Sequence, residues 1–178
     1  MTDNQTLVEQ TKSVLDKVKE LNASHSFMSV ISDDLALECA QSAEKRKEAG
    51  EDLPLYGYFI TIKDCVVVKD VESTASSRIL KGYNPIFDAT VVEKVKQAGG
   101  IILGKTIQDE FGFGSFSTKV GLDYSIPKNP NNTNHAAGGS SGGSAVATKL
   151  FQKEGIKHIA IAESTGGSIE CPASFCGV

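Results

Sequence analysis

The N-terminal part of the chain carries apolar positions at the spacing of helices. Between residues 5 and 21 apolar or small side chains recur with glutamates and lysines between them, which predicts an amphipathic surface helix; they are Leu7, Val8, Thr11, Val14, Leu15, Val18 and Leu21. Residues 26–32 alternate as a short strand does. The Ser-Asp-Asp run at 32–34 is typical of a helix start, and we expect this second helix to end near Gly50.

Shorter apolar runs follow in the middle of the chain. Residues 56–70 are rich in β-branched and aromatic side chains and predict two short strands around Lys63-Asp64. We expect Asp88 to cap a helix over 89–98, which two glycines then stop. A buried strand is predicted over 101–104.

A last strand is predicted over 157–165, where "KHIAIAEST" runs into glycines. Strand and helix alternate along the whole chain, which predicts an α/β fold with a largely buried sheet. The sequence shows no internal repeat and no domain boundary. The final "CPASFCGV" is apolar and has no polar tail, so we expect the chain to be the N-terminal part of a longer protein.

Composition narrows the possible partners and cofactors. With 178 residues, 40% of them hydrophobic, the chain is long enough for one core, and its net charge of −4 creates no field that would attract nucleic acid or an anionic membrane. The polar, acidic N-terminus resembles neither a signal nor a transit peptide, and no apolar run could span a bilayer. We expect reduced cysteines in the cytoplasm and no metal site, because the spacing of the Cys and His residues fits neither a CxxC pair nor a ligand set; they are Cys39, Cys65, Cys171, Cys176, His25, His135 and His158.

Two glycine-serine clusters are the most unusual feature of the sequence. They are "HAAGGSSGGSAVA" at 135–147 and "IAESTGGSIECPAS" at 161–174. A flexible linker is disfavoured because each cluster adjoins an apolar run. A phosphate loop is disfavoured because the first cluster lacks the Gly-Lys-Ser/Thr ending and the second also lacks GxGxxG spacing. The remaining interpretation is an acyl-transfer site.

Such a site needs a nucleophile, an oxyanion hole and a base. A strand–"STGGS"–helix turn would place Ser168 at a helix start, with the N–H groups of residues 165–168 converging on an oxyanion. No histidine has a suitable context to be the base. Lys63 lies in "FITIKDCVVV", and burial makes a lysine lose its proton more readily. Lysines in strands more often extend their ammonium to solvent, so these residues alone do not decide between the two roles.

Several segments together resemble the amidase signature family. They are "PLYGYFITIKDC", "DATVVEKVKQAGGIILGKTIQDEFGFGS", "GGSSGGSA" and "STGGSIECPASFCGV", and the resemblance covers about residues 15–178. It is strongest to the A (glutaminase) subunits of tRNA-dependent amidotransferases, especially their archaeal branch. The resemblance implies a central mixed, mostly parallel sheet covered by helices. The chain would then be the N-terminal part of a single amidase domain, with a helical segment over about 1–50 and the catalytic core from about 52 onward.

The resemblance also implies roles for particular residues. Lys63 would be the base, Ser140 a relay serine after a cis peptide, and Ser168 the acyl-forming nucleophile, with Ser140 touching both of the others. The oxyanion hole would be Thr165, Gly166, Gly167 and Ser168, and the substrate-pocket candidates are Gly114, Ser115 and Gly139. Asp64 should face away from Lys63 and bond backbone, because neighbouring strand residues point to opposite faces.

The implied activity is glutamine amide hydrolysis, which supplies ammonia for transamidation of Glu-tRNA(Gln) or Asp-tRNA(Asn). The chain itself would need no cofactor; a B subunit would use ATP and Mg²⁺ and contact most of the tRNA, and a C subunit would brace the pair. The 178-residue chain alone is expected to be inactive. Two alternatives are a stand-alone amidase acting on another amide and a non-catalytic fragment or scaffold.

Five positions depart from the family pattern without removing a candidate catalytic group. Ser164 stands where the family has Asp, and Glu170 where it has Arg. Phe59 replaces a proline, while Cys65 and Ile107 replace asparagines. We expect these changes to bear on substrate specificity.

Overall fold

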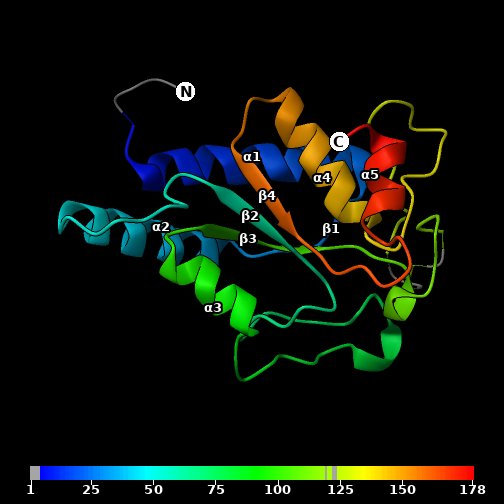
Figure 1. The fold of residues 1–178 in the computed structure, drawn as a ribbon, viewed down its shortest axis with the longest axis horizontal. Coiled ribbons are helices and arrows are strands. Elements are labelled where there is room, and N and C mark those ends of the chain that lie inside the picture. Colours follow the sequence, from blue (N-terminus) through cyan, green and yellow to red (C-terminus); the bar gives the residue numbers. More distant parts are fainter. Residues whose placement is uncertain (1–4, 119, 122–123) are drawn as a thin grey trace.

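Helices pack on both faces of a four-stranded sheet in the computed structural model, which describes residues 5–118, 120–121 and 124–178 (Figure 1). The elements are α1 (Leu7–His25), β1 (Met28–Ile31), α2 (Asp33–Glu48), β2 (Phe59–Lys63), α3 (Thr90–Gln97), β3 (Ile101–Thr106), α4 (Gly142–Lys153), β4 (His158–Ile161) and α5 (Glu170–Cys176), with short 3-10 turns at Arg78–Leu80 and Glu110–Gly112. The helices predicted near the N-terminus and the strands expected at 26–32, 101–104 and 157–165 are confirmed, with shifted ends. No helix in the described ranges has the length and apolar character needed to cross a membrane.

The sheet has the order β1-β3-β2-β4. β1 runs antiparallel to β3, whereas β2 is parallel to both β3 and β4. The predicted mixed, mostly parallel sheet is therefore confirmed. Because β2, β3 and β4 share one direction, their carboxyl ends meet at one edge, where polar residues that follow the strands come together.

Two sequence-based expectations for the middle of the chain are wrong. No second strand follows Lys63, because Val66 N–H donates to Lys63 O at 2.9 Å and turns the chain, leaving only an isolated bridge between Val68 and Val71. Asp88 does not cap α3, which has Ala89 at its N-cap. The Asp88 carboxylate instead accepts a hydrogen bond from Lys69 N–H at 2.8 Å and pairs with the Lys96 ammonium at 2.6 Å.

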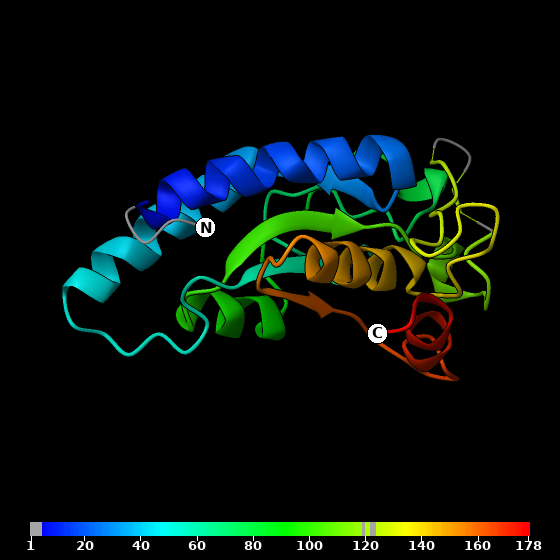
Figure 2. The same cartoon turned by 90° about the horizontal axis from the view of Figure 1, so that it is seen from above.

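The two faces of the sheet have separate cores. α1, α2 and α4 pack with Phe59, Ile101 and Leu103 on one face, and α3 packs with Ile60, Ile62 and Ile102 on the other. Figure 2 shows α1 and α3 on opposite sides of the sheet. The alternation of these β2 and β3 residues is the period of two that a strand imposes on its side chains.

A bulge at the end of β3 changes which way its last residues point. The pairing of β2 with β3 skips Leu103, since Ile60 lies opposite Ile102 and Thr61 opposite Gly104. Gly104 has φ +139°, and a Cβ there would overlap the carbonyl of Val30 in β1. The bulge carries Lys105 to the α3 face and Thr106 to the α4 face. On the α4 face the Thr106 hydroxyl meets Ser144 Oγ at 2.7 Å.

His158 gives the fold a pH-dependent stability. Its Nε2 lies 2.9 Å from Thr61 Oγ1, the Phe151 ring centroid is 4.5 Å away, and its enclosed Nδ1 has no partner among the described residues. Exclusion from solvent lowers the pKa of His158 to about 3. Because His158 binds a proton more readily in the unfolded chain, acid favours unfolding. The contribution of the neutral histidine to stability is complete above the ordinary histidine pKa of 6.5 and is lost as pH falls toward 3.

We expect the free energy of unfolding of the wild type, measured in urea, to fall with acidification more steeply than that of His158→Gln. The difference should approach about 1.4 kcal/mol per pH unit below pH 6. His135→Gln, at an exposed histidine, is the matched control and should keep the wild-type slope. Equal slopes for wild type and His158→Gln would show that the histidine is charged in the fold.

Candidate active site

Lys63 ends β2 inside the protein, with a side chain that is 0% exposed. Its Nζ donates to Ser140 Oγ at 2.9 Å, to Glu163 Oε1 at 2.6 Å and to the Glu163 carbonyl at 3.1 Å. The lysine is therefore buried and hydrogen-bonded and does not reach solvent. The predicted contact between Lys63 and Ser140 is confirmed.

Ser140 is held in place by its backbone. The Gly139–Ser140 peptide is cis, as predicted. The Ser140 carbonyl accepts from Asp109 N–H at 3.0 Å, and the next residue, Ser141, donates its N–H to the Ser168 carbonyl at 3.1 Å. Two residues after Ser141, a Cβ at Gly143 would overlap the carbonyls of Phe27 and Ile107. The first cluster is thus rich in glycine because backbone packs directly against backbone.

Ser168 lies close to Ser140 but is not joined to it as predicted. Within the described residues its hydroxyl makes no hydrogen bond, and the link between the two clusters is the main-chain bond from Ser141. The helix expected to begin at Ser168 begins at Glu170. The chain between Glu163 and Gly166 is exposed, so the turn that carries Ser168 lies at the surface while Ser140 is buried.

The turn before Ser168 leaves backbone donors available. Gly167 has φ +103°, a conformation that glycine adopts without strain. In the described part of the structure the N–H groups of Thr165, Gly166, Gly167 and Ser168 have no hydrogen-bond acceptor. Free N–H groups on a turn can bind an anionic oxygen, so an oxyanion hole here stays a prediction that the geometry permits.

Asp64 points away from Lys63, as expected for residues that are adjacent in the chain at the end of a strand. Its carboxylate accepts from Thr74 N–H at 3.3 Å, Thr74 Oγ1 at 2.6 Å and Ser76 N–H at 2.7 Å. The Lys105 ammonium lies 3.5 Å from Asp64 Oδ1 and donates to Ser73 Oγ at 2.7 Å. The side chains of Lys105 and Asp64 are 0% and 1% exposed, so this is a buried ion pair with hydrogen bonds around it.

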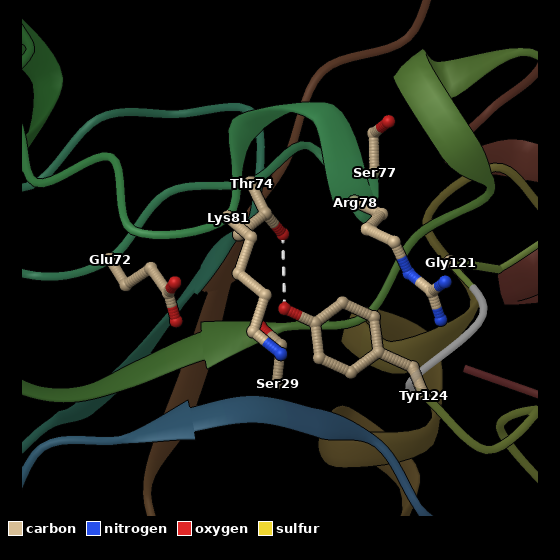
Figure 3. A pocket seen from close by; sticks show the side chains of 8 residues that line it. All are labelled: Ser29, Glu72, Thr74, Ser77, Arg78, Lys81, Gly121 and Tyr124. Carbon is tan, nitrogen blue, oxygen red and sulfur yellow. Dashed lines mark hydrogen bonds between the residues drawn. The ribbon is translucent and has the colours of Figure 1, made fainter.

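A cavity of about 110 Å³ is lined in part by Thr74, a hydrogen-bond partner of Asp64; Figure 3 shows its lining residues. The Thr74 hydroxyl also meets Tyr124 OH at 3.0 Å across the cavity wall (Figure 3). The lining residues are Ser29, Glu72, Thr74, Ser77, Arg78, Lys81, Gly121 and Tyr124. This lining includes neither Lys63 nor either candidate serine, so the cavity is separate from the candidate active site.

A family model described as "Amidase" matches residues 9–178. The chain belongs to the amidase family. It is 43% identical, over 96% of its own length and 33% of the relative's, to the A subunit of a glutamyl-tRNA(Gln) amidotransferase from Thermobifida fusca. To the corresponding chloroplastic/mitochondrial protein of Arabidopsis thaliana it is 41% identical over 97% of the chain and 31% of the relative. It therefore spans about a third of the length of these curated relatives.

Solved structures also share its fold. The A subunit of the glutamyl-tRNA(Gln) amidotransferase from Thermotoga maritima matches with a TM-score of 0.75 at 28% identity, over 99% of this chain and 38% of that one. A peptide amidase from Stenotrophomonas maltophilia matches with a TM-score of 0.83 at 26% identity, over 97% and 36%. The amidase fold predicted from the motifs is confirmed.

The two largest departures from the amidase pattern contact each other. Ser164 Oγ donates to Glu170 Oε2 at 2.8 Å, so the positions at which we expected an Asp and an Arg are joined by a hydrogen bond instead of an ion pair. Hydrogen bonds from backbone N–H groups and from Ser164 lower the pKa of Glu170. The turn that carries Ser168 is thus closed without an arginine.

The three pocket candidates pack against one another. Gly139 N–H donates to the Ser115 carbonyl at 2.8 Å, and the same carbonyl accepts from Cys171 Sγ at 3.2 Å. A Cβ at Gly114 or Gly139 would overlap the Asp109 carboxylate. Glycine is therefore required here for close packing, and a role in substrate binding stays a prediction.

Sequence reasoning about this amidase missed Glu163, Gln108 and Lys105. Glu163 stands inside the quoted "IAESTGGSIECPAS" cluster, and a carboxylate shortly before the glycine-rich turn was the available signal. Gln108 accepts from Cys65 N–H at 3.0 Å and so fixes the turn after Lys63. Lys105 could not be placed, because its direction depends on the bulge at Leu103–Gly104.

Removing Lys105 should destabilise the protein because it leaves the Asp64 carboxylate buried without its counter-charge. We expect Lys105→Met to lower the free energy of unfolding by about 3 kcal/mol, measured in urea at pH 7. The double variant Lys105→Met/Asp64→Asn should recover part of the loss, since neither position then carries a buried charge. A single variant as stable as the wild type would show that the pair is unimportant for folding.

Proposed function

We propose that this chain is part of a glutaminase, the A subunit of an aspartyl/glutamyl-tRNA amidotransferase. The observation that carries the proposal is the buried hydrogen bond of 2.9 Å between Lys63 Nζ and Ser140 Oγ in a member of the amidase family. The names of the curated relatives support the choice of glutamine as the amide substrate. The chain covers about a third of the length of these relatives.

The proposed reaction is acyl transfer through Ser168. Its Oγ attacks the γ-carboxamide carbon of glutamine, while the hydroxyl proton passes through Ser140 to a neutral Lys63. The N–H groups of residues 165–168 stabilise the oxyanion. Breaking the C–N bond returns the proton through Ser140 to the leaving nitrogen, which gives ammonia and a glutamyl ester on Ser168. Water, deprotonated by the same route, attacks the ester carbon and releases glutamate.

This reaction requires the hydroxyls of Ser140 and Ser168 to meet. Their backbones are already adjacent, because Ser141 N–H bonds the Ser168 carbonyl at 3.1 Å. A rotation of the Ser168 side chain, with a substrate packed over the exposed turn, supplies the missing contact. Catalytic hydrogen bonds that are long in a free enzyme often shorten when the substrate binds.

The proposed partners and location follow from the same assignment. A B subunit would receive the ammonia and use ATP and Mg²⁺ to activate the misacylated tRNA, which it would contact more than this chain does. A C subunit would complete the complex in the cytoplasm. The chain itself would hold no cofactor.

A stand-alone amidase is the second candidate. It is favoured by the TM-score of 0.83 with the peptide amidase, which is higher than the 0.75 with the Thermotoga protein. The two functions differ in substrate and partner. Glutamine hydrolysis that depends on the B and C subunits supports the first, and release of ammonia from peptide amides without them supports the second.

Ser168→Ala should abolish glutamine hydrolysis by the full-length protein in complex with its B and C subunits. One hydroxyl on a half-exposed turn contributes little to packing, so the thermal unfolding midpoint should stay within a few degrees of the wild type. A γ-glutamyl electrophile should label Ser168, as located by peptide mass spectrometry. Labelling at Cys171 instead would make a cysteine the nucleophile and refute the assignment.

Lys63→Arg should abolish the same activity although it keeps the positive charge. A guanidinium holds its proton throughout the accessible pH range and cannot accept one from Ser140. Wild-type kcat/KM should rise with pH through one ionisation. Lys157→Arg, at an exposed lysine, is the matched control and should keep the wild-type rate. Retention of most of the rate by Lys63→Arg would restrict the lysine to a structural role.

A further inference from the structure

The Glu163 carboxylate occupies a position that the proposed reaction does not use. It follows β4 on the chain and pairs with the Lys63 ammonium at 2.6 Å. The two partners differ in exposure, since the Lys63 side chain is 0% exposed and that of Glu163 is 48% exposed. The carboxylate can therefore turn into solvent without a desolvation cost, whereas the lysine cannot follow it.

Three acceptors surround Lys63 Nζ, which is the number that an ammonium ion can bind. An ammonium has three protons to donate, and the acceptors here are Ser140 Oγ, Glu163 Oε1 and the Glu163 carbonyl. When all three protons of the ammonium are engaged in this way, one of them is donated to Ser140 Oγ. General-base catalysis needs the opposite direction, in which an amine lone pair accepts the proton of Ser140.

We propose that Glu163 is a positioning residue that holds Lys63 as an ammonium ion and so sets the pH above which Lys63 acts as a base. This inference rests on the proposed function for the role of Lys63. A carboxylate beside an ammonium favours the charged lysine, so loss of the Glu163 charge lets Lys63 become neutral at lower pH. In the reaction, the Lys63 ammonium first gives one proton to the Glu163 carboxylate, which turns into solvent and releases that proton to water; the neutral amine then accepts the proton of Ser140.

Other charged groups near the pair have partners of their own. Asp64 and Lys105 pair with each other on the opposite face, and Asp109 accepts from Ser117 N–H at 3.0 Å. Glu170 accepts from Ser164. The α4 residues near Ser140 are uncharged serines and glycines. Glu163 is thus the one carboxylate that contacts the Lys63 ammonium among the described residues.

Cys65 is the remaining titratable group at this site. Its Sγ lies 3.9 Å from Glu163 Oε1. Loss of solvent around the sulfur raises the pKa of the Cys65 thiol, with the Glu163 carboxylate raising it further and the Lys63 ammonium opposing. At neutral pH this residue is therefore an uncharged thiol and does not compete with Glu163 for the lysine.

The direct test is an NMR titration of Lys63 in the full-length protein. The ¹³Cε signal of Lys63, assigned by its disappearance in Lys63→Arg, reports the protonation of the amine as pH rises. In Glu163→Gln we expect the titration midpoint to move at least one pH unit down, a tenfold larger acid dissociation constant. Glu170→Gln, at an exposed glutamate seven positions later, is the matched control and should leave the midpoint unchanged.

An unchanged midpoint in Glu163→Gln would overturn the proposal. If that variant fails to fold, Glu163→Asp decides, because withdrawing the carboxylate by one methylene should lower the midpoint by a smaller amount. The titration needs no substrate, so its result is independent of whether the enzyme hydrolyses glutamine. In an active enzyme, the acid limb of kcat/KM should move by the same amount as the NMR midpoint, and a loss of rate without movement would make Glu163 an ordinary structural residue.

Discussion

The buried ion pair between Lys105 and Asp64 is the constraint on which the arrangement of this site depends. It joins the end of β3 to the residue after β2, and both side chains are almost fully buried. Burial lowers the pKa of Lys105, against the opposing effect of the Asp64 carboxylate. Asp64 also binds Thr74 and Ser76, which fixes the segment beside the strand ends. With Asp64 held on one face, the preceding Lys63 must point to the other, toward α4 and Ser140.

That geometry explains how the site combines a rigid half with an exposed half. Lys63 and Ser140 are fully buried, and glycines bring the backbone before α4 against its neighbours. Thr165 and Gly166, in contrast, are exposed, and Ser168 is only partly covered. Proton transfer needs fixed distances between donor and acceptor, whereas substrate entry needs open space. Under the proposed function, the base comes from a strand and the nucleophile from a loop, which meets both needs.

The sequence was sufficient to predict the elements that depend on residues close together in the chain. The helical spacing of Leu7 to Leu21 identified α1, and its start at Thr6 is a capping box with Glu9. The family motifs located Lys63 and Ser140, whose contact is present. The valines after Lys63 were assigned to a strand because β-branched composition does not distinguish a paired strand from a loop whose apolar side chains are buried. Lys105 escaped notice because one extra residue in β3 reverses the face on which it lies. Glu163 escaped because its role is a tertiary contact with a residue far away in the sequence.

The order of the strands also has a consequence for how the protein folds. Within the described sheet β2 lies between β3 and β4, and the bond from Lys63 to Glu163 closes a loop of 100 residues. Closing long loops costs chain entropy before any contact repays it, so topologies rich in distant contacts fold slowly. The pairing of β2 with β3 closes a much shorter loop than the pairing of β2 with β4. Lys63 therefore gains its acceptors from two segments that follow β2 at long range, Ser140 before α4 and Glu163 after β4. The contacts of Lys63 with Ser140 and Glu163 are thus among the most distant in sequence that the described sheet brings together.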